Sequence, residues 1–229
     1  MSARLEFPLA QGWSRGLVIG FEDIAGSRDL NMGDFLHAKQ VHGSRIYEPS
    51  YQEIRRGGAL ELEADGVCFN NGQILDTKFG LLVKSADCVP LIYVHRTEPR
   101  VAAVHAGWRG LQQGTHLKPF SVLGFDPRDT WVWLGPSLNG FEVGEDMWSQ
   151  FADRDDTEIF KRDPALASDK RRFYPWRKIE KDFKALGVEL LYNVEVNTAI
   201  DENFASWRRC KAQGLAKIPQ QNYSWIKKL

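Results

Sequence analysis

Apolar residues along the chain fall into short runs that glycine, proline or charged residues interrupt. Runs of four to eight residues that are rich in Val, Ile and aromatic side chains are typical of β-strands. The continuous run at 88–95 indicates a strand covered on both faces. The pattern as a whole predicts strands at 16–21, 40–47, 65–69, 79–84, 88–95, 101–105, 131–134 and 188–196.

Helical periodicity is clearest in one segment. Within 176–186 the apolar side chains recur at the spacing of one helix face, and Lys and Glu fill the opposite face. Gly187 follows at the position where a glycine commonly ends a helix. Shorter helices are expected at 109–118 and 144–152. With no linker, repeat or low-complexity tract, this mixture predicts a mixed α/β layered sandwich that forms a single domain over 1–229.

The composition is that of an ordinary globular protein, with 43% apolar and 26% charged residues in 229 positions. Thirty Lys and Arg balance thirty Asp and Glu, which argues against broad electrostatic binding to nucleic acid or to anionic lipid. No apolar run reaches the roughly 20 residues that cross a bilayer, and the N-terminus lacks the apolar core of a signal peptide. The odd set of cysteines, Cys68, Cys88 and Cys210, suits a reducing compartment. We therefore expect a cytoplasmic protein.

Three segments place a side chain that can bind a metal beside a glycine or proline turn. They contain His42, Cys88 and His105. A catalytic zinc takes three protein ligands and leaves a fourth position open, and two imidazoles with one thiolate meet that need. The three residues are far apart in sequence and belong to no CxxC or HExxH motif, so spacing alone leaves other interpretations open. Cys88 is equally consistent with a small buried apolar residue, and the two histidines with a turn and a strand end.

The turn that follows His105 adds further candidates. Gly107 and Gly110 permit a close approach of the backbone, and Arg109 offers a planar fork suited to phosphate or carboxylate. Trp108 is suited either to stack on a base or to pack in the core. Asp87, next to Cys88, is suited either to orient a ligand or to cap the start of a strand.

These segments together resemble the YfiH-type family, whose members carry the names laccase-domain protein, polyphenol oxidoreductase and purine nucleoside phosphorylase. Weaker similarity extends the resemblance over nearly the whole chain, including NYSWIKKL, which resembles the closing strand of the family. The motifs match in order and local spelling, as QVHG (40–43), ADGV (64–67), SADCVPL (85–91) and VAAVHAGWRGL (101–111).

The resemblance implies a mixed α/β sandwich related to cysteine-hydrolase-like folds, with a zinc held by His42, Cys88 and His105. It implies phosphorolysis of adenosine, inosine, guanosine and methylthioadenosine, and deamination of adenosine. We expect Arg109 to act in catalysis and to bind phosphate, and Asn31 and Gln40 to contact the substrate. Copper is the alternative metal.

Three other functions stay open. A copper-dependent phenol oxidase requires further imidazole ligands, and only His37, His95 and His116 remain, without a neighbouring pair. A metal-free hydrolase acting on peptidoglycan precursors would use Cys88 as nucleophile and His105 as base. The third is a non-catalytic metal-binding regulator. It is suggested by the short segment 34–39, where the family has a longer stretch with an Asn-Arg pair.

Overall fold

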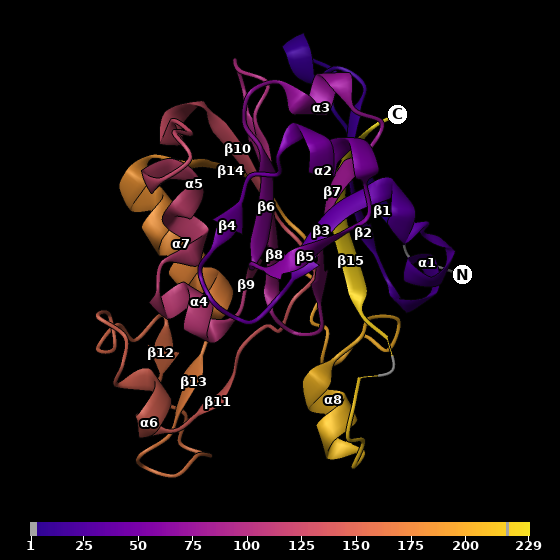
Figure 1. Ribbon diagram of the computed structural model, residues 1–229. Coiled ribbons are helices and arrows are strands. Elements are labelled where there is room, and N and C mark those ends of the chain that lie inside the picture. The colour runs from indigo at the N-terminus through magenta and orange to yellow at the C-terminus, as the bar shows by residue number, and fades with distance from the viewer. Residues whose placement is uncertain (1–3, 219) are drawn as a thin grey trace.

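The computed structural model describes residues 4–218 and 220–229, and its centre consists of two six-stranded sheets that pack face to face (Figure 1). The first sheet contains, in spatial order, β1 (Arg4–Pro8), β2 (Leu17–Glu22), β15 (Asn222–Lys228), β7 (Gly80–Ser85), β3 (Phe35–Lys39) and β5 (Ala59–Glu63). The second contains β14 (Glu189–Asn193), β10 (Thr130–Leu134), β8 (Val89–His95), β9 (Val101–Ala106), β6 (Gly66–Phe69) and β4 (Ile46–Tyr47).

A small third sheet and short helices complete the fold. The third sheet has the order β11 (Phe141–Val143), β13 (Arg171–Phe173) and β12 (Phe160–Lys161). No helix among the described residues is both long and apolar enough to cross a membrane. The helices are α1 (Ile24–Asp29), α2 (Tyr51–Arg56), α3 (Gln73–Asp76), α4 (Trp108–Gln112), α5 (Lys118–Ser121), α6 (Glu145–Trp148), α7 (Pro175–Leu186) and α8 (Trp207–Ala212).

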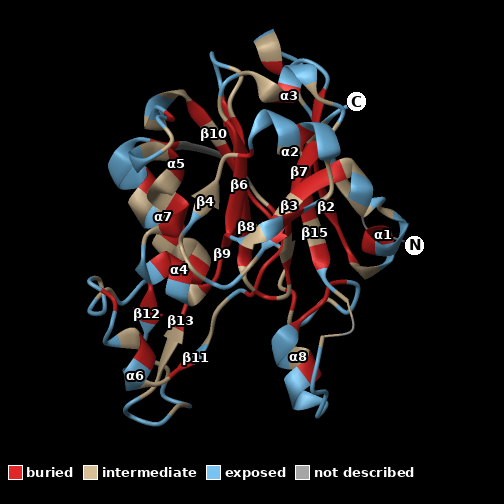
Figure 2. Ribbon diagram, in the orientation of Figure 1, coloured by how far each residue is buried: buried red, intermediate tan, exposed pale blue. Residues whose placement is uncertain are grey.

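The core lies in layers on both sides of the second sheet. Ile92 and Val94 of β8 pack with residues of the first sheet, whereas Leu91 and Tyr93 pack with the layer that contains α4 and α7. Figure 2 shows the central strands as buried, whereas the outer helices combine buried, intermediate and exposed residues. This alternation explains why the sequence of 88–95 is apolar throughout, because both faces of the strand are covered. The prediction of a mixed α/β layered fold is confirmed.

Helix α7 follows the predicted pattern closely. It buries Ile179 and Phe183 against the second sheet, and it ends at Gly187, which has a left-handed φ of 73°. The helix predicted at 109–118 is instead divided into α4, a short 3-10 turn and α5. The division occurs at Gly114, where a φ of 71° interrupts the helical backbone.

The predicted strands agree with the structure except at two places. The strand predicted at 188–196 is β14, which ends at Asn193. Residues 40–45 form a loop, and only Ile46 and Tyr47 are in a strand, so the prediction of a strand over 40–47 was wrong. The helix at 144–152 is shorter than predicted and covers Glu145–Trp148. The closing strand implied by NYSWIKKL is β15. Strands β1, β3, β5 and β11–β13, and helices α1, α2, α3 and α8, were not predicted.

Candidate metal centre and its cleft

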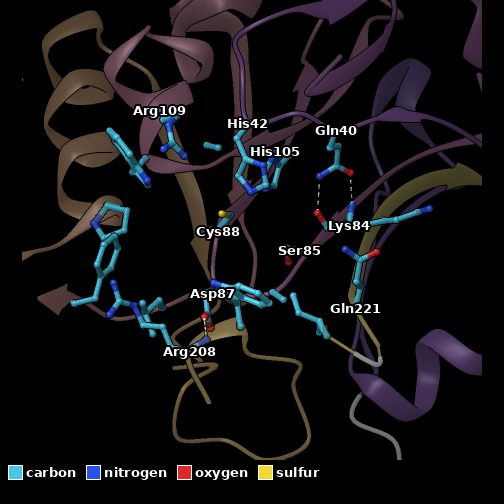
Figure 3. A pocket seen from close by; sticks show the side chains of 18 of the residues that line it. Gln40, His42, Lys84, Ser85, Asp87, Cys88, His105, Arg109, Arg208 and Gln221 are labelled. Atoms are coloured by element: carbon cyan, nitrogen blue, oxygen red, sulfur yellow. Dashed lines mark hydrogen bonds between the residues drawn. The ribbon is translucent and has the colours of Figure 1, made fainter. Parts of the chain in front are cut away.

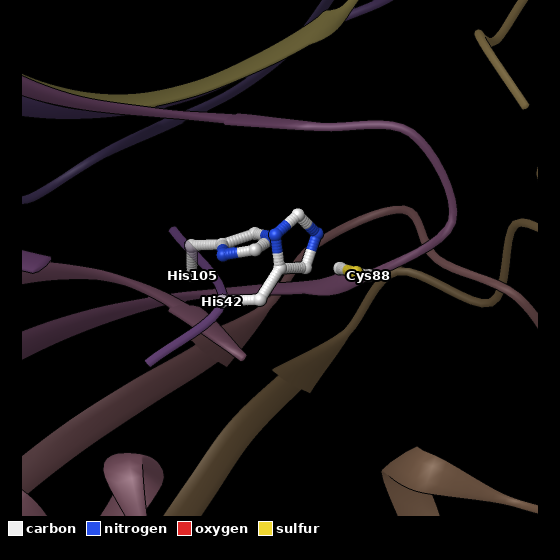
Figure 4. Close-up of side chains that lie close together, drawn as sticks. All are labelled: His42, Cys88 and His105. Carbon is white, nitrogen blue, oxygen red and sulfur yellow. The ribbon is translucent and has the colours of Figure 1, made fainter. Parts of the chain in front are cut away.

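The three predicted ligands come together at one point. His42, Cys88 and His105 each offer a ligand atom, and these atoms all lie within 4.8 Å of one another (Figure 4). The two imidazole rings meet edge to face, with centroids 4.9 Å apart and an angle of 84° between their planes. The arrangement provides two nitrogen donors and one sulfur donor for a single cation.

The pairing of β8 with β9 explains how two of the ligands meet. The strands are antiparallel, with Val89 opposite Ala106 and Pro90 opposite His105. Cys88 directly precedes β8, so it lies beside the end of β9 where His105 is found. His42 reaches the same point from the loop between β3 and β4, with a left-handed φ of 61°.

A buried carboxylate holds the loop and one imidazole in place. Asp65 is fully buried, and its two oxygens accept hydrogen bonds from the backbone N–H groups of His42 (2.8 Å), Gly43 (2.7 Å) and Val41 (3.3 Å). The same carboxylate bonds Nδ1 of His105 at 2.9 Å. Because Nδ1 of His105 is engaged, Nε2 is left for a metal. A carboxylate behind a ligating histidine is a common feature of metal sites. The sequence analysis had assigned Asp65 no role, although a lone acid before a buried strand is a signal that could have found it.

Electrostatics favour a thiolate at Cys88. Burial by itself raises the pKa of this thiol, but the charge and hydrogen bonding of His105 and the nearby His42 lower it to about 6. Burial likewise acts to lower the pKa of His105, whereas the Cys88 thiolate and Asp65 raise it to about 9. At neutral pH the thiolate form that a metal requires is therefore already present.

The loop before Cys88 is fixed by its neighbour in the chain. Asp87 has a left-handed φ of 89°, and its main-chain oxygen accepts a hydrogen bond from the N–H of Leu138 at 2.9 Å. Its carboxylate accepts one from the hydroxyl of Thr198 (2.8 Å) and one from the backbone N–H of Arg208 (2.8 Å). A non-glycine residue in this conformation is held only where its surroundings determine it. Asp87 therefore connects the Cys88 loop to the start of α8.

The turn after His105 also fits a metal at this point. A Cβ atom at Gly107 would lie 2.9 Å from Cδ2 of His42 and 3.3 Å from Sγ of Cys88. Any side chain there would press on two of the three ligands. The close backbone approach expected of Gly107 is thus observed, and the residues present fit a cation bound by two imidazoles and a thiolate.

The site opens into a cavity of about 910 Å³. In Figure 3, Arg109 and Arg208 lie on one side of Cys88, and Gln40, Lys84 and Gln221 lie on the other. Aromatic side chains contribute to the wall, so the cavity combines apolar surface with a few polar groups, as small-molecule sites do. The aromatic members of the lining are Trp108, Phe141 and Trp207.

The predicted substrate-binding residues have different positions. Arg109 lines the cavity, with its guanidinium carbon 4.4 Å from the ring centroid of Trp108. Gln40 also lines it, but its amide donates to the main-chain oxygen of Lys84 (2.7 Å) and accepts from its N–H (2.8 Å). Asn31 instead caps the 3-10 turn at Met32–Asp34 and is not among the residues that line the cavity.

The other histidines lie apart from the site. His95 accepts at Nδ1 from the N–H of Glu98 at 3.1 Å, and His116 bonds Asp182 at 2.6 Å through Nε2. His37 lies on β3. Within residues 4–218 and 220–229, His42, Cys88 and His105 are the only group of three or more His, Cys, Asp or Glu residues placed to hold a metal.

Sequence comparison relates the chain to known proteins. Residues 21–216 match the family described as multi-copper polyphenol oxidoreductase laccase. The chain is 33% identical over 114 residues to a purine nucleoside phosphorylase of Pseudomonas aeruginosa, a match that covers 49% of this chain and 42% of the relative. It is 32% identical over 137 residues to purine nucleoside phosphorylase YfiH of Escherichia coli, covering 58% and 55%. The matches thus span about half the length of these relatives.

Solved structures share the fold. A Neisseria meningitidis protein aligns with a TM-score of 0.75 and 19% identity, covering 99% of this chain and 98% of the other. The hypothetical protein YfiH of Bacillus licheniformis aligns with a TM-score of 0.73 and 15% identity, covering 93% of each chain. At these identities the likeness concerns the fold alone.

Proposed function

Because the chain belongs to the multi-copper polyphenol oxidoreductase laccase family, we propose that it is a zinc-dependent enzyme that cleaves purine nucleosides with phosphate. The observation that carries the proposal is the convergence of His42, Cys88 and His105 at a cavity that Arg109 also lines. The names of the relatives, purine nucleoside phosphorylase, support the substrate class.

In phosphorolysis, different residues of the chain bind the metal, the phosphate and the purine. A zinc held by His42, Cys88 and His105 would supply a Lewis acid for phosphate or for the purine base. Arg109 binds the phosphate through charge-assisted hydrogen bonds, and its guanidinium is oriented by stacking on Trp108. Trp207 offers flat apolar surface for the purine, and the cavity is large enough for a nucleoside with phosphate.

One observation favours a second candidate function. The pKa values of Cys88, about 6, and His105, about 9, describe a thiolate beside an imidazolium. That pair is the arrangement of a cysteine nucleophile with its histidine, so a metal-free Cys–His hydrolase is the alternative. The metal content of active protein separates the two, because zinc ligation occupies the thiolate. Multicopper phenol oxidation is disfavoured by the separation of His37, His95 and His116 within the described chain.

The decisive assay supplies zinc-loaded protein with inosine or adenosine, with and without phosphate. Free base and ribose 1-phosphate are expected only when phosphate is present, and they should be absent with His42→Ala, Cys88→Ala and His105→Ala. Adenosine also reports deamination, because inosine and ammonia form without loss of the sugar. No release of base at stoichiometric enzyme would overturn the proposal, and turnover by metal-free protein would favour the hydrolase.

A further inference from the structure

Arg208 is a second arginine of the cleft to which the sequence analysis gave no role. It lies on α8, lines the same cavity as Arg109, and is exposed. Its guanidinium carbon lies 4.2 Å from the ring centroid of Phe141, and Nη2 donates to the main-chain oxygen of Glu142 at 3.4 Å. The side chain thus reaches from α8 to β11, on the opposite wall.

The neighbouring Arg209 shows what a structural arginine looks like here. Its guanidinium donates to the main-chain oxygens of Thr198 (2.8 Å), Asp201 (3.2 Å) and Phe204, which closes the loop before α8. Arg208 has one long side-chain hydrogen bond among the described residues. A guanidinium carries five N–H donors, so most of those on Arg208 remain for a ligand.

Fixed charges in the cleft leave a positive excess. Of the carboxylates in the lining, Asp87 accepts hydrogen bonds at both oxygens, and Glu142 is paired with Lys170 outside the cavity. On the described part of the chain, Arg208, Arg109 and Lys84 take part in no ion pair. Asp87, whose two hydrogen-bond donors are neutral, and Asp146 carry the opposing negative charges, so these three cations face two carboxylates.

The position of Arg208 is coupled to the metal centre. Its backbone N–H donates to the carboxylate of Asp87 at 2.8 Å, and Asp87 is bonded covalently to Cys88. The backbone of Arg208 is therefore held in place relative to the Cys88 sulfur, and its guanidinium packs on the ring of Phe141. Such support reduces the entropy lost when a guanidinium binds an anion.

We propose that Arg208 binds the phosphate co-substrate, in concert with Arg109, on their shared side of Cys88 (Figure 3). The inference rests on the proposed phosphorolysis for the identity of the anion. The planar fork of a guanidinium matches two oxygens of phosphate. Two arginines from separate elements, α4 and α8, then hold the anion beside the metal centre.

Kinetics of matched variants test the inference. Arg208→Gln removes the charge, Arg208→Lys keeps it but loses the fork, and Lys211→Gln makes the same charge change at an exposed position of α8. We expect Arg208→Gln to raise the KM for phosphate roughly ten- to hundredfold, as loss of a charge-assisted hydrogen bond does. The KM for nucleoside should stay close to that of the wild type. The KM for phosphate of Arg208→Lys should lie between the values of the wild type and Arg208→Gln, and that of Lys211→Gln should match the wild type.

A binding measurement without nucleoside separates the two proposals. Inorganic phosphate is titrated into zinc-loaded protein and followed by phosphorus NMR. Weaker binding by Arg208→Gln supports the anion site even if the wild type shows no phosphorolysis, in which case only the proposed function fails. Two results overturn the inference: unchanged phosphate binding and KM in Arg208→Gln, or a rise confined to the KM for nucleoside. If Arg208→Gln does not fold, as judged by circular dichroism, Arg208→Lys provides the same comparison.

Discussion

Replacing Asp65 by Asn tests the origin of the site geometry with the smallest change of shape. The carboxylate has two acceptor oxygens. One takes the N–H of His42 and Nδ1 of His105, and the other takes the N–H groups of Val41 and Gly43. An amide has one acceptor oxygen and two N–H donors. In either orientation, Asn at this position leaves two of these donors facing another donor.

The magnitude follows from the number of bonds lost. A hydrogen bond to a charged group contributes about 1.5–3 kcal/mol, so losing two costs about 3–6 kcal/mol in stability. The effect on metal binding is smaller, because the ligands themselves remain. Loss of a group behind a ligating histidine typically weakens metal binding by about 10–100-fold, or about 1.4–2.8 kcal/mol. Asp65→Asn should therefore lower both the free energy of unfolding and the affinity for zinc.

The assay pairs urea unfolding with zinc competition against a chromophoric chelator. Asp23→Asn is the matched control, because Asp23 is also buried and accepts a backbone N–H, from Gly26 at 2.7 Å, on α1. That variant should keep its zinc affinity, and the amide oxygen of Asn can accept the same N–H at the start of α1. An affinity for zinc in Asp65→Asn within about twofold of the wild type would refute the role assigned to this carboxylate.

Two further variants test packing and pH dependence. Gly107→Ala should lower zinc affinity by about tenfold or more, because its Cβ would lie 2.9 Å from His42 and 3.3 Å from Cys88, whereas a φ of −74° suits alanine. Chelator competition measures the zinc affinity, and an unchanged value would show that the turn accommodates a Cβ atom without displacing the ligands. Burial, and secondarily the charge of Lys84, lower the pKa of His37 to about 4. His37 is therefore protonated at a higher pH in the unfolded chain than in the folded protein. The free energy of unfolding should fall as the pH drops from about 6.5 towards about 4. His37→Gln should reduce that fall in urea titrations at pH 7 and 5; an identical fall would mean that other groups cause it.

Local sequence predicted the elements whose own residues determine them. The two-sided apolar run of β8 and the helical period of α7 were both found, because burial imposes each pattern directly. Strands β3 and β5 were missed. Strand β3 has only two adjacent buried apolar residues before His37, and β5 alternates apolar and charged residues over five positions, so neither contains the longer apolar run by which the other strands were found. Residues 40–45 form a loop because a buried carboxylate from elsewhere in the chain accepts hydrogen bonds from their N–H groups. No local pattern carries that information, so a strand was predicted there.

The sequence predicted the three metal ligands of the candidate site but not the residues that hold them in position. The turns around His42, Cys88 and His105, together with the family resemblance, identified the three donors that the structure brings together. The residues that position them, Asp65 and Asp87, act over long sequence separations and are visible only in the fold. Arg208 was missed because an arginine near the C-terminus gives no local indication that it faces a cleft.

The metal content of purified protein tests the central claim most directly. After incubation with zinc and removal of excess ion, mass spectrometry of the metal should give about one zinc per chain for the wild type and for Cys210→Ala, a buried cysteine on α8 that serves as the control. Cys88→Ala should retain none. Stoichiometric zinc in Cys88→Ala, or an absence of bound zinc in the wild type, would contradict the assignment of His42, Cys88 and His105 as a metal centre.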